Sequence, residues 1–484
     1  MTSDEKARWL AIVITLMGGA LRFWRLGDPP LVGDESYYWL WSEHLAWSYF
    51  DHPGGVAWMI RASTGLGGPS EFGVRWLNAM LAALAPFLLY GLGRRTGNPG
   101  AGVLAAATLA FAPGAIIVAR HVYTDTLPIV LMLVAFHAMW PMIMQQGSRQ
   151  LGWRWLATGL VGALLMNTKL SAYPLFVGVA LAVVCWRREL LKDRRLWASL
   201  GIIVLGLIPS LAWNLAHDYA GWRWTWQQFT AGTVRARGPL SIVHHMITYL
   251  TPPFIALAAV GFLEILGRQH RWLVVPALLL AAPVLVSPAN SPRNLLLGAT
   301  LLLVPAAAWW SEARARRWTA GALLLALLIY GVGTTQGLVQ PTKLPRSSVV
   351  DAIRYDGIGW PDLGRELADE PGLIFTADYS VASQLWFYAR RPVHTAWEQY
   401  RLWGIPPFDT AVVIAEPYVP AERVDHALRG VMAHVEGPTE RAFHPPSEPL
   451  VTKRVRLWRA SGPQVDPAQF ANALDFFTLY GEER

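Results

Sequence analysis

The strongest constraint on the fold is a series of apolar runs, most of them long enough to cross a membrane. An α-helix needs about 20 predominantly apolar residues to span the hydrocarbon core of a bilayer. The composition agrees, because 53% of the residues are hydrophobic and only 15% are charged, whereas soluble domains carry about a quarter charged residues. The sequence therefore predicts a polytopic α-helical membrane protein with about eleven spans, at 9–27, 74–93, 100–119, 126–145, 153–170, 172–186, 196–214, 245–266, 272–288, 294–310 and 318–338.

Short basic loops alternate with a second set, which holds the acidic stretch at 28–72, the RHVYTD turn at 120–125, the long loop at 215–244 and SPRN at 291–294. The positive-inside rule keeps short basic loops in the cytoplasm. If the N-terminus is cytoplasmic, one alternate set is basic throughout: Arg94-Arg95, Arg149 with Arg154, the run 187–195, Arg268 with Arg271, and Arg314 to Arg317. The other set and the C-terminal tail are then predicted to lie outside. The formal charge of +8 thus reports orientation in the membrane, and no nucleic-acid partner is expected.

The last third of the chain differs in composition. Residues 339–484 are polar and contain no apolar run of membrane length. Short apolar runs at 372–378 and 410–416 are typical of buried strands, and 453–460 alternates like a strand. The segments SVASQLWFYAR and AERVDHALRGVMAHV have the pattern of amphipathic helices. We predict two domains, a membrane domain at 1–338 and a small periplasmic α/β domain at 339–484.

The first outer loop, from Asp28 to Phe72, is much more than a connector. Residues 35–48 have helical spacing with a face rich in Trp and Tyr, and Pro53 is well placed to start a second helix. Two amphipathic helices on the membrane surface are therefore expected. Their interfacial anchors would be Trp39, Trp41, Trp47 and Trp58.

Several carboxylates lie where helices meet water on this outer side. Asp34 and Glu35 follow the first span, and Asp125 opens the fourth. Each can cap a helix or favour its dipole, but ionisable groups at the ends of membrane spans are also candidates for function. Both interpretations can hold for the same residue.

Cations converge on the same side of the membrane. Arg120 and His121 leave the third span at this level, and Lys169 interrupts an apolar run at a similar depth. A carboxylate can accept a hydroxyl proton, and cations can stabilise a leaving phosphate. A cation at such a position is more often an interfacial anchor than a ligand, so the set matters more than any member. The set indicates a site for substrates that carry a hydroxyl and a phosphate.

Several motifs resemble one known family. The stretch DESYYWLWSEHLAWSYFDHPGG at 34–55 resembles the first-loop signature of bacterial glycosyltransferase family 39, the protein-mannosyltransferase-like group of the GT-C fold. Supporting matches are EFGVRW, GRRTG, ARHVYTD, SLAWNLAHDYAGWRW and WEQYRLWG, which extend over most of the chain. The group is related to the lipid A aminoarabinose and galacturonic acid transferases. Two positions depart from its pattern: Gly54 stands where a second Pro is frequent, and Leu170 where Tyr is frequent.

The resemblance implies an inverting glycosyltransferase of the bacterial inner membrane. It would move one sugar from a polyprenyl monophosphate to a hydroxyl of lipid A or lipopolysaccharide, another envelope glycan, or protein Ser/Thr, on the periplasmic face. Asp34 would be the general base, Glu35 would orient it or the donor, and Asp125 would be a second catalytic acid. The residues implied in substrate binding are Tyr38, His52, Arg120, His121, Lys169 and Arg293.

No metal ligands are assigned, because the acids show no recognisable ligand spacing; a divalent cation stays open as a cofactor. The one cysteine, Cys185, excludes a disulfide within the chain and a cysteine-rich metal site. Two alternative functions are kept: a transporter or flippase of lipid-linked saccharide, and an enzyme similar to an O-antigen ligase. Membrane lipid is a partner in every case.

Overall fold

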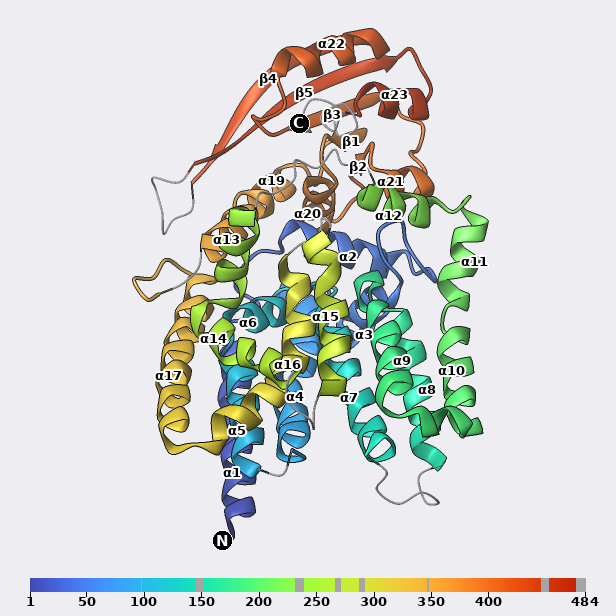
Figure 1. The fold of residues 1–484 in the computed structure, drawn as a ribbon. Helices are drawn as coiled ribbons and strands as arrows, with labels where there is room; N and C mark the ends of the chain where they lie inside the picture. Colours follow the sequence, from blue (N-terminus) through green and yellow to red (C-terminus); the bar gives the residue numbers. More distant parts are fainter. Residues whose placement is uncertain are drawn as a thin grey trace.

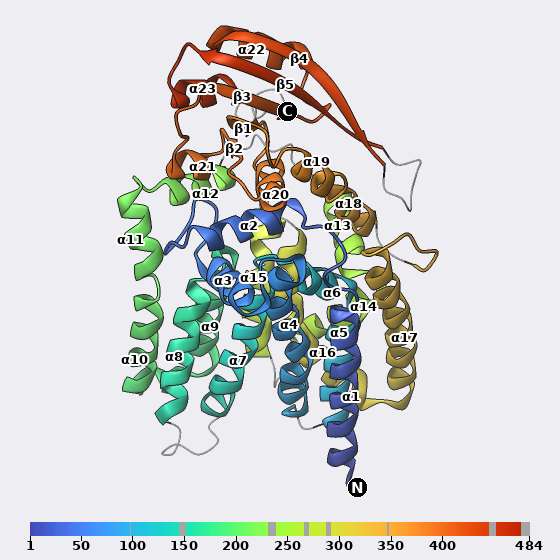
Figure 2. The same ribbon diagram turned by 180° about the vertical axis from the view of Figure 1, so that it is seen from behind.

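The computed structural model describes residues 1–96, 98–144, 152–230, 239–265, 271–286, 292–345, 348–444 and 452–475. A bundle of helices forms the larger part, and a small sheet with its own helices covers one end of it (Figure 1). The N-terminus lies at the opposite end of the bundle, as the view from behind also shows (Figure 2). We call the two ends of the bundle the covered end and the N-terminal end.

The predicted spans fall on helices. Each of the eleven ranges overlaps at least one helix. The helices of the bundle are α1 (Ser3–Phe23), α4 (Glu71–Arg94), α5 (Pro99–Phe111), α6 (Pro113–Arg120), α7 (Thr126–Ile143), α8 (Gly152–Met166), α9 (Pro174–Trp186), α10 (Arg194–Leu205), α11 (Ile208–Ala216), α12 (Ala220–Thr230), α13 (Pro239–Leu250), α14 (Pro252–Ala259), α15 (Arg271–Val286), α16 (Leu295–Glu312) and α17 (Arg314–Gly337). Among the described residues, five helices are long and apolar enough to cross a membrane alone, or six if α5 and α6 form one span bent by 57°. The count of eleven spans stays a prediction.

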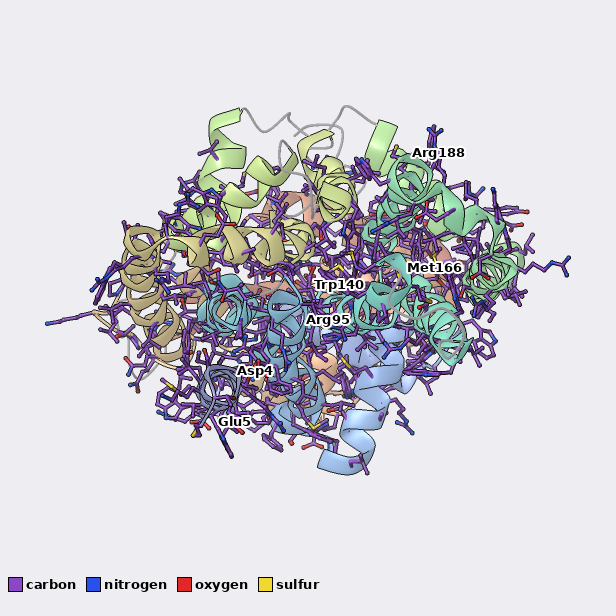
Figure 3. The ribbon with its side chains drawn as sticks, turned by 60° about the horizontal axis from the view of Figure 1, so that its bottom comes forward. Asp4, Glu5, Arg95, Trp140, Met166 and Arg188 are labelled. Atoms are coloured by element: carbon purple, nitrogen blue, oxygen red, sulfur yellow. The ribbon has the colours of Figure 1, made fainter. Side chains whose placement is uncertain are left out.

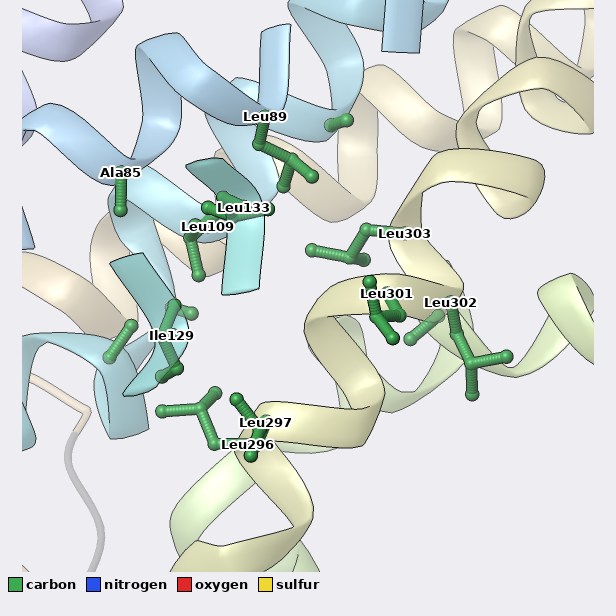
Figure 4. Packing of buried hydrophobic residues seen from close by; sticks show 14 of the residues in the cluster. Ala85, Leu89, Leu109, Ile129, Leu133, Leu296, Leu297, Leu301, Leu302 and Leu303 are labelled. Atoms are coloured by element: carbon green, nitrogen blue, oxygen red, sulfur yellow. The ribbon is translucent and has the colours of Figure 1, made fainter. Parts of the chain in front are cut away.

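The core of the bundle is aliphatic and closely packed. Leu89, Leu109, Leu133 and Leu301 bring α4, α5, α7 and α16 together in one buried cluster (Figure 4). Helices in lipid gain little from hydrophobic burial against each other, so close backbone approach matters more. At Gly93, for example, an added Cβ would lie 2.8 Å from a Cα of α5, so only glycine allows α4 and α5 to approach this closely.

The first outer loop forms the two expected helices, α2 (Gly33–Glu43) and α3 (Gly55–Gly67). Their surroundings differ from the expectation, because Trp39 and Trp41 are buried and α2 is enclosed along most of its length. The covering element is α20 (Tyr379–Ala389) of the C-terminal region, which packs along α2. Trp47 stays 63% exposed. The Trp/Tyr-rich face of α2 therefore serves as an interface within the protein.

The C-terminal region is a mixed five-stranded sheet with the order β2-β1-β3-β5-β4. β1 pairs parallel with β2 and β3, while β5 pairs antiparallel with β3 and β4. Its further elements are α18 (Ser348–Asp356), α19 (Trp360–Glu366), β1 (Leu373–Thr376), β2 (His394–Thr395), α21 (Glu398–Trp403), β3 (Thr410–Ala415), α22 (Ala421–Val431), β4 (Met432–Phe443), β5 (Lys453–Pro463) and α23 (Pro467–Ala473).

The three predicted strands are present, but one predicted helix is too long. The amphipathic pattern predicts a helix through Val435, whereas α22 ends at Val431 and β4 begins at Met432. Pairing with β5 starts at once, with Met432 opposite Pro463, because long-range backbone pairing outweighs a weak local helix preference. The boundary between residues 338 and 339 stays a prediction; one core cluster contains residues from both sides of it.

Candidate active site

Two carboxylates and two cations meet at the covered end of the bundle. The Lys169 Nζ atom lies 2.6 Å from Asp125 Oδ1. The Arg293 guanidinium stands between the two acids, with Nη2 3.0 Å from Asp34 Oδ2 and Nε 3.5 Å from Asp125 Oδ2. We call these four residues the charged cluster. It brings Asp34 and Asp125 into one site, as the sequence predicts.

Each member of the charged cluster stands at the end of a helix or in a break between helices. Asp34 is in the first turn of α2, and Asp125 is the N-cap residue of α7. Lys169 lies in the gap between α8 and α9, which Pro174 ends as the first residue of α9. Arg293 belongs to a short 3₁₀ turn that leads into α16. Helix ends leave backbone groups and side chains free to point into a shared space.

The two acids differ in their access to solvent. The Asp125 side chain is 5% exposed, and its partner Lys169 is 6% exposed. The Asp34 side chain is 29% exposed, although it touches the same guanidinium. A buried ion pair is costly to disrupt, so Asp125 is held in place by its cation. Asp34 is the more solvent-accessible of the two carboxylates.

An aromatic wall surrounds the cluster. Tyr379, the first residue of α20, donates its hydroxyl to Asp34 Oδ1 at 3.3 Å. The ring of Tyr123 lies 4.2 Å from the Arg293 guanidinium carbon, in a cation–π contact. Tyr38 is buried in α2, 6.1 Å from the ring of Tyr37. Aromatic rings therefore lie beside the charged groups of the cluster.

His52 lies beside the charged cluster. Burial, together with the nearby charges of Lys169 and Arg293, lowers its pKa to about 3. The imidazole is therefore neutral at physiological pH, and its Nδ1 atom is buried with no hydrogen-bond partner within the described residues. A neutral histidine can donate or accept a hydrogen bond but adds no positive charge.

Glu35 is placed in a different environment from its neighbour Asp34. It is fully buried and receives two bonds from Arg75, Nη2 to Oε2 at 2.6 Å and Nε to Oε1 at 2.8 Å. The backbone N–H of Val122 donates to Oε1 at 3.0 Å. Burial alone raises the pKa of a carboxyl group, but Arg75 and His121 together lower that of Glu35 to about 2. Its oxygens are engaged within the protein.

Arg75 also ties down the chain that precedes α2. Its guanidinium donates to the carbonyl oxygens of Leu26, Pro29 and Pro30 at 2.6–3.0 Å. The Glu35–Arg75 pair thus fixes the first turn of α2, in which Asp34 stands. The assignment of Glu35 as a catalytic residue stays a prediction; its contacts are those of a positioning residue.

Arg120 and His121 also lie outside the charged cluster. Arg120 Nη1 donates to the carbonyl oxygens of Leu21, Arg22 and Trp24 at 2.8–3.1 Å, which otherwise end α1 without partners. His121 Nδ1 lies 3.5 Å from Glu35 Oε2. Their predicted contact with a phosphate is untested, and their observed contacts hold the end of α1 and the buried Glu35.

A third acid of the first loop lies near the cluster and was given no role. Asp51 accepts a 2.8 Å hydrogen bond from the Tyr37 hydroxyl, which in turn accepts one of 3.0 Å from Trp397 Nε1. Burial raises the pKa of Asp51 to about 7, with the nearby charge of Asp34 adding to the effect. Asp51 therefore titrates near neutral pH, which is unusual for an aspartate.

Sequence reasoning missed the contribution of the C-terminal region. Tyr379 and Trp397 both come from beyond residue 339 and reach the first loop. The segment WEQYRLWG, which starts at Trp397, resembles a family motif, and this was the available signal. Tyr379 is the first residue of a helix that follows a strand and begins with an ordinary N-cap. No local sequence pattern marks it as a site residue.

The charged cluster offers little room for a metal ion between its acids. Within the part of the chain that the structure describes, no group of three or more His, Cys, Asp or Glu side chains is arranged to hold a metal. The space between Asp34 and Asp125 is taken by the Arg293 guanidinium. These residues do not fit a divalent cation in their present arrangement.

Known proteins share this fold and parts of this sequence. A family model described as dolichyl-phosphate-mannose-protein mannosyltransferase matches residues 51–213, a range that includes Asp125 and Lys169. The lipid A galacturonosyltransferase RgtD of Rhizobium johnstonii is 25% identical over 383 residues, covering 74% of this chain and 77% of the relative. The chain is thus similar in sequence to the protein-mannosyltransferase-like group, the group that its first-loop motif resembles. The predicted resemblance and fold class are confirmed.

The solved structures extend the likeness to nearly the whole chain. ArnT from Cupriavidus metallidurans in the apo state is 15% identical with a TM-score of 0.63, covering 94% of this chain and 99% of ArnT. The same enzyme bound to undecaprenyl phosphate gives a TM-score of 0.62. The oligosaccharyltransferase of Archaeoglobus fulgidus has a TM-score of 0.51 at 11% identity, covering 84% of this chain and 68% of that one. The chain thus has the GT-C fold, and several of its described helices are long and apolar enough to cross a membrane.

Proposed function

We propose that the protein transfers a single sugar from a polyprenyl monophosphate to an acceptor hydroxyl, with inversion at the anomeric carbon. The observation that carries the proposal is the bridging of Asp34 and Asp125 by Arg293, with Lys169 on Asp125. One small site thereby combines an accessible carboxylate with two cations. The similar proteins, which include a lipid A galacturonosyltransferase and ArnT bound to undecaprenyl phosphate, support this substrate class.

The chemistry of the step follows from the positions of these groups. Asp34 accepts the proton of the acceptor hydroxyl as its oxygen attacks the anomeric carbon. The bond from that carbon to the phosphate oxygen breaks, and the phosphate leaves with the electron pair. Lys169 and Arg293 stabilise the charge that develops there. An ammonium has three N–H donors, and the contact with Asp125 uses one of them.

Attack from the face opposite to the phosphate inverts the configuration of the sugar. Asp125 keeps the cations in place and prevents them from neutralising Asp34 completely.

His52, which is neutral and beside the cluster, is proposed to hydrogen-bond the donor sugar, and the ring of Tyr38 to form part of the enclosure. Lipid A or another envelope glycan is the preferred acceptor class, because the relative RgtD is a lipid A galacturonosyltransferase.

We further propose that the covered end faces the periplasm. The basic loops between the spans then lie in the cytoplasm, as the positive-inside rule requires. The charged cluster and the C-terminal region come to the same side, where lipid-linked sugar meets an acceptor exposed to water.

The test is product formation by purified protein in detergent or nanodiscs. Polyprenyl-phosphate sugars are supplied with lipid A, and products are identified by mass spectrometry. We expect a lipid A product one sugar heavier from the wild type, none from Asp34→Asn, and normal yield from Asp28→Asn. Asp28 is the matched control because it is exposed and pairs only locally with Arg25. Absence of any product from the wild type would favour the transporter instead.

A further inference from the structure

A hollow of about 260 Å³ opens at the N-terminal end of the bundle, far from the charged cluster. It lies where α1, α4 and α7 meet. Its lining residues are Arg8, Phe87, Leu88, Tyr90, Gly91, Arg94 and His137. We call it the basal pocket. Its walls are apolar on the side toward the middle of the bundle and basic at the rim.

Positive charge gathers around the basal pocket. Arg8 and Arg94 are part of its lining. Arg95 and Arg154 both donate to the carbonyl oxygen of His137, each at 3.2 Å. Figure 3 looks onto this end of the molecule and labels Arg95.

Two acids are close by, and they offset only part of this charge. Asp4 pairs with Arg94 at 3.2 Å, and Glu5 caps the start of α1 through the backbone N–H of Thr2. Four arginines therefore face two carboxylates. An anion at the rim would balance the remainder.

A buried hydroxyl points to a ligand more specifically than the arginines do. Tyr90 lines the pocket and is 3% exposed, yet its hydroxyl has no hydrogen-bond partner among the described residues. An unsatisfied buried polar group costs about 1–3 kcal/mol in general. A phosphate or ester oxygen in the pocket would supply the missing acceptor.

An exposed apolar stripe on α4 leads away from the pocket. Met80, Leu84 and Phe87 are 38%, 50% and 39% exposed. Their spacing of four and three residues places them on one face of the helix. The stripe runs from the pocket toward the middle of the bundle, along the path that an acyl chain takes when its headgroup stays at the membrane surface.

We propose that the basal pocket binds the headgroup of an anionic phospholipid. The phosphate lies at Arg8 and Arg94, and the glycerol ester accepts a hydrogen bond from the Tyr90 hydroxyl. One acyl chain follows the stripe on α4. Basic pockets between membrane helices on the cytoplasmic side are known to suit such headgroups. Basic residues at span ends also follow from the positive-inside rule alone, but that rule accounts neither for a hollow nor for the buried hydroxyl.

Lipid binding to the full-length protein tests the proposal. Delipidated protein in a neutral detergent is titrated with phosphatidylglycerol, phosphatidylcholine and inorganic phosphate, and bound lipid is counted by native mass spectrometry. We expect phosphatidylglycerol to be preferred over phosphatidylcholine and to resist displacement by an equal concentration of inorganic phosphate. Equal binding of both lipids, or ready displacement by inorganic phosphate, would overturn the proposal.

Two variants separate a built site from general surface attraction. Arg8→Gln should weaken phosphatidylglycerol binding about fivefold, the effect of one basic residue near anionic lipid. Arg188→Gln is the matched control, because this exposed arginine also lies at the N-terminal end but well away from Arg95 (Figure 3); it should leave the affinity unchanged. An equal loss of phosphatidylglycerol affinity in the two variants would show that the lipid is held by nonspecific charge attraction and not by the pocket.

The Tyr90→Phe variant adds a readout that a merely structural role would not give. Removing an unpaired hydroxyl should leave the thermal midpoint of the lipid-free protein unchanged or slightly raised. Phosphatidylglycerol binding should fall about fivefold because the ester loses its donor. A lower midpoint without lipid, or an unchanged affinity, would contradict the assignment of Tyr90.

Discussion

At the scale of single residues, the site depends on the different burial and partners of three nearby acids. Glu35 is buried against Arg75, Asp51 is half-buried and bonded to the Tyr37 hydroxyl, and Asp34 is half-buried at the charged cluster. The sequence could place Asp34 and Asp125 on one side of the membrane. It could not separate Asp34 from Glu35, because the partner of Glu35 comes from another helix, 40 residues away.

Tyr379→Phe tests whether the C-terminal region orients the base. Losing a hydrogen bond to a carboxylate should lower kcat about tenfold, while the affinity for the polyprenyl-phosphate donor stays unchanged. Steady-state kinetics and donor titration measure the two effects. Tyr355→Phe is the control, since Tyr355 is 43% exposed in the same region. A Tyr379→Phe enzyme with weakened donor binding and unchanged kcat would contradict this role.

Asp51→Asn tests the raised pKa of that carboxyl group. The folded state holds the Asp51 proton up to about pH 7, whereas an unfolded aspartate releases it near pH 4. Stability therefore falls as pH rises through this window, and the full cost of the buried charge is present above it. The variant, which cannot ionise, should melt several degrees above the wild type at pH 8, with the gap closing toward pH 4. Thermal midpoints across this range measure it, and a gap that is constant with pH would contradict it.

At the scale of elements, α2 is held between the bundle and α20. Asp356 accepts the Gly33 N–H at 2.7 Å, the hydroxyl oxygens of Ser36 and Ser383 are 2.9 Å apart, and Tyr388 accepts the Leu31 N–H at 2.7 Å. Sequence patterns correctly predict that α2 and α20 are helices. They assign the aromatic face of α2 to the membrane surface, because a single sequence does not show which partner will cover an apolar face.

Gly33→Ala tests the contact between these helices. An added Cβ at Gly33 would collide with the Cβ atom of Ser380 in α20. Replacing glycine by alanine within a helix normally stabilises it by up to about 1 kcal/mol. We expect the opposite here, a lower thermal midpoint together with reduced transfer. Gly65→Ala in α3 is the control, because its Cβ would meet nothing within 4 Å. Equal behaviour of the two variants would show that the contact is unimportant.

The Glu35–Arg75 pair gives a second prediction at this scale. Removing one partner of a buried ion pair costs about 3–5 kcal/mol because the other charge is left unpaired. Glu35→Gln and Arg75→Met should each lower the yield and the thermal midpoint, and the double variant should lose less than the sum. Fluorescence-detected gel filtration with heating measures all three. A stable, well-folded Glu35→Gln protein without activity would instead support the catalytic role predicted from the sequence.

At the scale of the whole molecule, the C-terminal sheet and α2, which carries Asp34, lie toward one end of the bundle, and the N-terminus lies at the other (Figure 1). The basal pocket is lined by residues of α1, α4 and α7. Hydropathy and charge predict the spans and the sides on which loops lie. They cannot predict that α20 closes over the site, since this depends on packing between segments about 345 residues apart. Nor can they predict the basal pocket, which exists only where three helices meet.

Accessibility labelling tests the orientation. With Cys185→Ser as background, Thr439→Cys in the exposed part of β4 should react with a membrane-impermeant maleimide in intact spheroplasts. Arg188→Cys, at the N-terminal end, should react only after the membrane is opened. Labelling of Arg188→Cys in intact spheroplasts with protection of Thr439→Cys would reverse the proposed topology.

The division of labour within the charged cluster is the central claim, and donor binding by two variants tests it most directly. Binding of a polyprenyl monophosphate is titrated in purified Asp34→Asn and Lys169→Ala proteins, with sugar transfer followed in the same preparations. We predict that Asp34→Asn binds the phosphate at least as well as the wild type yet forms no product, while Lys169→Ala loses most of its phosphate affinity. An Asp34→Asn protein that transfers sugar at the wild-type rate, or unchanged phosphate binding by Lys169→Ala, would contradict the account.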